Sequence, residues 1–223
     1  MKILLGREEV DPNKSDGGGR TPLSRAARHW GGGFCAGKAV VGLLLGRRGV
    51  GSRQPDNDGR TPLSHTAEAG IRGMVGILLG REVNPNKPDN GGRTHLSCAS
   101  WGRSSDQTRE YIKVVKMLIG REEGIPDKSN NDDRTPLSYA AEHGFEGVAG
   151  MLLGRGEVNP NKPDNLGRTP LMLATSGGHE GVVTLLQSHE AVAVAPPNAE
   201  QSPPRRSYRH FFASLCCRSR KLS

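Results

Sequence analysis

The sequence Asp-Asn-Asp-Gly-Arg-Thr-Pro-Leu-Ser-His-Thr-Ala-Glu-Ala-Gly occupies residues 56–70, and close versions of it recur along the chain. Its centre, Arg-Thr-Pro-Leu in four copies and Arg-Thr-His-Leu in one, places threonines at positions 21, 61, 94, 135 and 169. A second string, Leu-Leu-Gly-Arg or a close variant, ends at residues 7, 47, 81, 121 and 155. Repetition at intervals of 33 to 41 residues predicts a solenoid of stacked units.

Residues 61–80 predict two short helices joined by a turn. Thr61 can cap the first helix with its hydroxyl, and Pro62 suits the first helical position. Gly70 can end that helix, because a left-handed C-cap costs glycine little. The second helix carries apolar residues at helical spacing, namely Val75, Leu78 and Leu79. The Pro/Asn/Gly-rich stretch at 84–91 then predicts a turn-tipped finger.

This pattern resembles the ankyrin repeat, in which Asp-x-x-Gly-x-Thr-Pro-Leu-His-x-Ala-Ala-x-x-Gly precedes Val-Val-x-Leu-Leu-Leu. Residues 56–70 and 135–144 carry the resemblance most closely, and the finger Asn-Pro-Asn-Lys-Pro is similar to fingers of large fungal arrays. The resemblance implies an all-α solenoid with one partial repeat and about five full repeats. We expect the array to span 1–189, with the partial repeat at 1–16 and repeats from about 17, 56, 89, 130 and 164, followed by a disordered basic tail at 190–223.

Four features of the sequence carry further expectations. The family histidine after Thr-Pro-Leu is replaced by Ser or Met, which predicts fewer bonds between repeats. His95 stands in place of proline and is expected to loosen a helix start, while Gly42, Gly76 and Gly150 in second helices predict a marginally stable array. Because residues 1–6 match only the end of a second helix, we expect the chain to be a fragment of a longer array.

The basic charge of the chain is concentrated in its tail. The net charge is +8, and six of the basic residues lie in the last 36 residues, against two glutamates. In the tail, Cys216 and Cys217 are flanked by Phe and Arg, which suits lipidation and attachment to an anionic membrane. The alternatives for this tail are nonspecific nucleic-acid contact and a segment without function.

Candidate partner-binding residues follow from the slots that contact partners in the family. An arginine precedes each threonine, and five in register could form a stripe for an acidic protein segment: Arg20, Arg60, Arg93, Arg134 and Arg168. The alternative is that each arginine pairs with a nearby Asp. The finger tips and first-helix ends add further candidates: Asn57, Asp58, Asn165, Leu166, Glu68, Trp101, Glu142 and His143. Trp101 is the best single anchor candidate, because aromatic residues dominate interface energetics. The alternative is that Trp101 packs against the extra residues of repeat three.

Motifs for catalysis or cofactor binding are weak. Residues 32–39 approach a phosphate-binding loop, yet Ala39 follows Lys38 where that loop needs a Ser or Thr hydroxyl. No nucleophile elbow and no Cys/His grouping at zinc spacing occurs, and His65, His143 and His179 are expected on the solvent side or at turns. The sequence therefore predicts no enzyme activity, no cofactor and no metal.

The predicted function is a protein–protein interaction scaffold that binds a protein partner through its fingers and concave helix face. The alternatives are a repeat fragment of a larger multidomain enzyme or receptor, and a peripheral membrane adaptor attached through the Cys-Cys tail. We expect a monomer without specific nucleic-acid binding, located in the cytoplasm, with the nucleus as the alternative.

Overall fold

The computed structural model describes residues 11–28, 36–47, 49–81, 84–102, 108–120 and 124–194. Within these ranges, ten helices form five antiparallel pairs and no strand occurs. The first helices of the pairs are α2 (Pro22–Arg28), α4 (Pro62–Glu68), α6 (His95–Trp101), α8 (Pro136–Glu142) and α10 (Pro170–Ser176). The second helices are α3 (Ala36–Leu45), α5 (Arg72–Leu79), α7 (Thr108–Ile119), α9 (Glu146–Leu153) and α11 (Glu180–Val194). The predicted all-α solenoid is confirmed.

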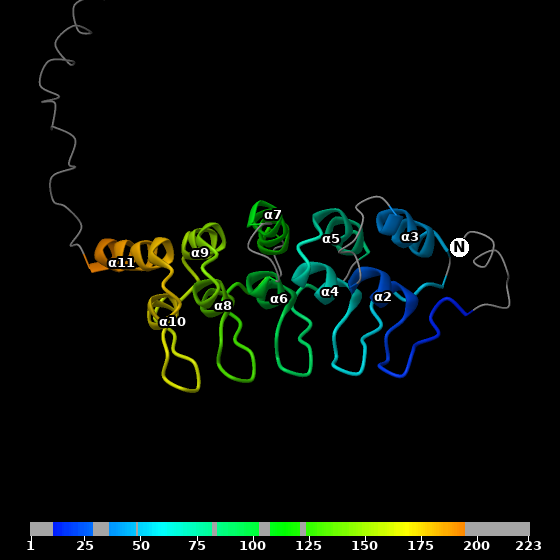
Figure 1. The fold of residues 1–223 in the computed structure, drawn as a ribbon, viewed down its shortest axis with the longest axis horizontal. Coiled ribbons are helices and arrows are strands. Elements are labelled where there is room, and N and C mark those ends of the chain that lie inside the picture. Colours follow the sequence, from blue (N-terminus) through cyan, green and yellow to red (C-terminus); the bar gives the residue numbers. More distant parts are fainter. Residues whose placement is uncertain are drawn as a thin grey trace, which may run out of the picture.

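The two kinds of helix form two layers, and the fingers project side by side from the layer of first helices (Figure 1). We number the helix pairs as repeats one to five and call the surface made by the fingers and first helices the inner face. Each first helix packs against the first helices of the neighbouring repeats, and the second helices do likewise. The last helix reaches Val194, beyond the end at residue 189 expected for the array.

The first helices begin after a threonine that caps them, as the sequence predicts. Thr61, Thr94, Thr135 and Thr169 each accept a hydrogen bond from the backbone three residues on. The hydroxyl groups of Ser64 and Ser138 in turn accept a hydrogen bond from the backbone N–H of their cap threonine, which completes two capping boxes. The serines that replace the family histidine therefore act within their own repeat.

The backbone conformation favours glycine at only two of the positions in the repeat where glycine recurs. Gly70, after a first helix, has φ +67°, and Gly59, before the arginine, has φ +76°. After a second helix, Gly80 is right-handed with φ −66°, so this position does not need glycine for its backbone. In repeat four, Asp133 occupies the position before the arginine and adopts φ 56° without being glycine.

The core lies between the layers and consists mainly of Leu, Val and Ala. Leu63, Ala67 and Leu78 are fully buried, and their counterparts in the neighbouring repeats are also buried. Tyr111 is the largest of these buried residues, and its ring stacks on Phe145 with centroids 5.6 Å apart. The first helices thereby stand at fixed positions from which their outward side chains define the inner face.

Candidate functional site

The base of every finger is closed by one Asp or Asn side chain. Asp89 Oδ1 accepts hydrogen bonds from the backbone of Gly91 and Arg93, both at 2.9 Å. The same two backbone bonds recur at Asp16, Asp56, Asn130 and Asp164. These turns hold the following arginine at the same place in each repeat, so the arginine column lies in register along the inner face.

The arginines of this column are all engaged in ion pairs. Three contact the Asp of their own finger: Arg20 with Asp16 at 3.1 Å, Arg93 with Asp89 at 2.8 Å, and Arg168 with Asp164 at 2.7 Å. Arg60 instead contacts Glu68 at 3.0 Å and Asp89 of the next finger at 3.6 Å, while Arg134 contacts Glu142. Because each positive charge faces a carboxylate, the column offers an array of oriented guanidinium groups with little net field.

The carboxylate that each arginine reaches varies with its own finger residue, which is Asn130 in repeat four and Asp elsewhere, and with the residue four positions after the cap threonine. In repeat two this residue is His65, whose Nε2 donates to Asp56 Oδ2 at 2.9 Å. In repeat four it is Tyr139, whose hydroxyl accepts from Asn130, and Arg134 lies 4.4 Å above the tyrosine ring. In repeats three and five, where this residue is Cys98 or Leu173, the arginine stays on its own Asp.

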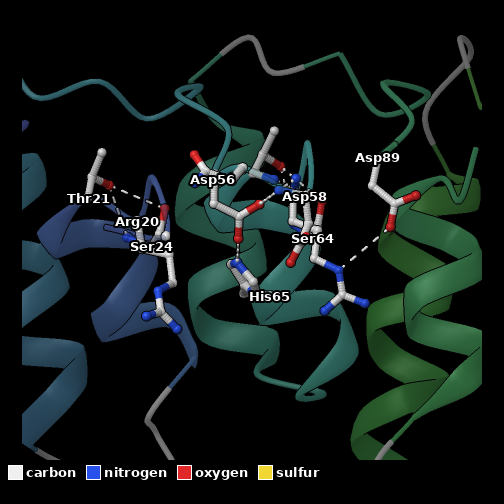
Figure 2. Close-up of polar contacts among 12 residues, drawn as sticks. Arg20, Thr21, Ser24, Asp56, Asp58, Ser64, His65 and Asp89 are labelled. Carbon is white, nitrogen blue, oxygen red and sulfur yellow. Dashed lines mark hydrogen bonds and ion pairs between the residues drawn. The ribbon is translucent and has the colours of Figure 1, made fainter. Parts of the chain in front are cut away.

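His65 was expected on the solvent side, and this expectation is wrong. Its side chain is only 2% exposed, and Figure 2 shows it directed at Asp56 from within α4. Burial lowers the pKa of His65, although the neighbouring Asp56 acts in the opposite direction. His143 and His179 are half-buried and lie at the turns after first helices.

The expected loosening of the helix start at His95 is also wrong. Thr94 caps α6, and His95 is fully buried. Its Nδ1 donates to the Pro85 carbonyl at 2.8 Å, so Nε2 of the neutral ring accepts from the Thr61 hydroxyl at 2.9 Å. His95 thus supplies a bond between repeats two and three that the serines at the family histidine position do not.

The finger tips are joined by a ladder of asparagines. In fingers two to five, the asparagine backbone N–H and side-chain amide both donate to carbonyls of the preceding finger, through Asn57, Asn90, Asn131 and Asn165. Asn57 and Asn165, both candidates for partner contact, therefore also hold the fingers together. The other tip candidates are exposed: Asp58 borders the ladder, and Leu166 is 75% exposed. The recurring asparagine was visible in the sequence and is the signal by which the ladder could have been predicted.

Trp101 lies at the centre of a cluster of flat side chains between repeats three and four. Its ring is 6.3 Å from Tyr139 and 6.5 Å from His143, measured between centroids. Arg93 lies over the indole at 5.1 Å, which is cation–π distance. Trp101 is only partly buried, so this cluster presents an aromatic side chain whose orientation is fixed by its neighbours.

The structure brings the other first-helix candidates to the same face. Glu68 and Glu142 each hold an arginine of the column, and His143 approaches Glu142 at 3.8 Å. Repeat one differs, because Arg20 and Arg25 share the single carboxylate of Asp16 while Arg28 is exposed. Unbalanced positive charge on the first helices is therefore found at α2.

The described residues offer little support for catalysis or metal binding. Cys98 is buried, and burial raises the pKa of its thiol to about 12, which keeps it protonated and a poor nucleophile. Among the described residues, no group of His, Cys, Asp and Glu could hold a metal ion. The described helices also include none that is both long and apolar enough to cross a membrane. The near phosphate loop at 32–35, the side chains of Lys38 and Ala39, and Cys216 and Cys217 lie outside the described residues.

Part of the chain matches a known protein family. Residues 107–194, which span α7 to α11, match the family model described as ankyrin repeats in three copies. A search of curated proteins gives no match.

Proposed function

Because this chain is an ankyrin repeat protein, and ankyrin repeats are in general protein–protein interaction modules, we propose that it is a non-enzymatic scaffold whose inner face binds a protein partner around Trp101. The partner lies across the first helices of repeats three and four and reaches the neighbouring fingers. We expect the protein to act as a monomer in the cytoplasm.

The observation that carries this proposal is the packing of Trp101. Tryptophan and arginine are the residues most enriched among interface hot spots, and here Arg93 lies over the indole of Trp101. Both side chains are already ordered in the free protein, since Asp89 holds Arg93 through two of its nitrogens. Little side-chain entropy is then lost when a partner covers them.

The pairing of the arginine column changes what the partner should look like. A uniformly acidic segment gains little from arginines that already face carboxylates, apart from those of α2. A segment that covers Trp101 with apolar atoms and offers hydrogen-bond acceptors to Arg93 and Arg134 fits this surface better. An acidic end of the same segment would lie near Arg25 and Arg28.

Affinity capture with the full chain tests the proposal. A partner retained by the unmodified protein should be lost with Trp101→Ala and retained with Arg72→Ala, which changes an exposed residue of α5 on the opposite layer. With the purified partner, Trp101→Ala should weaken binding about 30-fold, the size of an interface hot spot, and Trp101→Phe should restore most of it. If Trp101→Ala bound the partner as well as the unmodified protein does and Arg72→Ala lost binding, the interface would lie on the second helices and the proposal would be overturned.

A further inference from the structure

The outer side of repeat five differs from the junctions between earlier repeats. Three residues after the cap threonine, the first four repeats carry serines that are at most 3% exposed beneath the next repeat: Ser24, Ser64, Ser97 and Ser138. In repeat five the same position is Met172, which is 58% exposed. Terminal repeats of a solenoid ordinarily show a polar outer surface, so an exposed methionine here indicates an occupant.

Finger five shows the same lack of a covering neighbour. A methyl group added at Gly59 would lie 2.4 Å from the side chain of Asn90 in the next finger, whereas at Gly167 nothing lies within 4 Å. Leu166, beside Gly167, is 75% exposed. Thr175 is also exposed, although its counterpart Ala141 is fully buried. We call Leu166, Gly167, Met172 and Thr175 the end face.

We propose that residues 208–215 of the same chain cover the end face. Residues 195–223 lie outside the described residues, so the fit is argued from their sequence. Large apolar and aromatic residues are concentrated at Tyr208, Phe211, Phe212 and Leu215. Positions 208 and 212, and likewise 211 and 215, are four residues apart and would share one side of a helix, as in the first helices that cover the earlier junctions.

Charge favours the same pairing. Between residues 164 and 190, three acidic residues, Asp164, Glu180 and Glu190, stand against the single basic Arg168. Residues 195–223 contain six basic residues and one acidic residue. A basic apolar segment therefore meets an acidic repeat with exposed apolar side chains, which favours this segment over a second copy of the array as the occupant.

The chain is long enough to return to the end face. The 15 residues of α11 correspond to a helix length of about 22 Å. The 13 residues at 195–207 can span up to about 43 Å when extended, and they include four prolines that disfavour a continued helix. Because the segment is tethered, its effective concentration at the end face is about millimolar, so modest contact area is sufficient.

Disulfide trapping in the full chain tests this proposal. With Cys35→Ser in all proteins, Met172→Cys should form an intramolecular disulfide with Cys216 or Cys217 under mild oxidation, identified by peptide mapping. Arg72→Cys, on the far side of repeat two, is the matched control and should react at least tenfold more slowly. Adding Phe211→Ser and Phe212→Ser should abolish the excess rate, because these changes remove the apolar contact and leave the cysteines in place.

Hydrogen exchange supplies an independent readout without new cysteines. The Phe211→Ser, Phe212→Ser protein should show amide exchange about tenfold faster in α10 and unchanged exchange in α4 and α6, since capping interactions act on the adjacent repeat. The proposal would be overturned if Met172→Cys and Arg72→Cys formed disulfides at equal rates. It would also be overturned if amide exchange in α10 were the same with and without the two phenylalanines. Disulfides formed only between chains would also overturn it, and would assign the end face to a second copy.

Discussion

Asp133 occupies a backbone position where the other four repeats carry glycine. Its φ of 56° lies in the left-handed region, which costs most L-residues roughly 1–2 kcal/mol. Asp133→Gly should therefore raise the free energy of unfolding by about 0.5–1 kcal/mol, after allowing for the greater freedom of glycine in the unfolded chain. Urea denaturation measures this change. Gly92→Ala is the matched control and should destabilise, because its added carbon would lie 2.4 Å from the Asn131 side chain.

His95 should make the array sensitive to mild acid. Burial lowers its pKa to about 4, against 6.5 in the unfolded chain, and it faces Thr61, the Pro85 carbonyl, Lys87 and Asp89. The unfolded chain binds the proton more readily between these values, so stability that is present above pH 6.5 is lost as the pH falls toward 4. The loss attributable to His95 is about 3 kcal/mol.

Unfolding free energies of His95→Gln at pH 7 and pH 4.5 test this expectation. The variant should be less stable at pH 7, because the bond to Thr61 is altered, but its difference between the two pH values should shrink. Gly42→Ala is a suitable control, since it changes stability without removing a titrating group. A pH difference in His95→Gln equal to that of the unmodified protein would contradict the assignment. His65 contributes in the same direction and accounts for part of the remaining acid sensitivity.

At the scale of the helix, the second helices can be strengthened without repacking. Gly42 in α3 has open space around the position of a side chain, and Gly150 in α9 has its nearest neighbour, Leu185, at 3.9 Å. Alanine at either position should stabilise the array by about 0.5–1 kcal/mol, the helix-interior cost of glycine. Thermal denaturation measures the gain. Gly70→Ala should do the opposite, because Gly70 has φ +67° and lies against the Tyr111 ring.

The finger and first-helix elements also show what the sequence could and could not predict. Thr61, Pro62 and Gly70 act through local backbone geometry, so their roles followed from the residues themselves. His65 and His95 act through groups nine to 34 residues away, and their burial depended on how neighbouring repeats are placed. The arginine column was visible in the sequence, as was the alternative that each arginine pairs with a nearby Asp, which three of the five do. The partners of Arg60, on the following helix and on the next finger, depended on how the repeats stack.

At the scale of the whole molecule, the extensive contacts among the described helices run between neighbours. The helix pairs in extensive contact all belong to one repeat or to adjacent repeats within the described ranges. Stability is then a sum of repeat terms and nearest-neighbour terms, and different parts of the array can open separately. His95, the asparagine ladder and the Arg60–Asp89 ion pair act at such junctions, so the inner face depends on the coupling between repeats as much as on each repeat.

Leu137→Ala is the variant that tests this coupling. Leu137 is fully buried in α8, and truncating it should cost about 3 kcal/mol. In an array coupled only between neighbours, amides of α8 to α11 should lose protection from hydrogen exchange together, while α2 to α5 keep theirs. Leu23→Ala in α2, equally buried, should produce the reverse pattern. Loss of protection in every repeat with either variant would show that the array unfolds as one unit. A partner bound around Trp101 would then stabilise all five repeats equally, instead of acting mainly on repeats three and four.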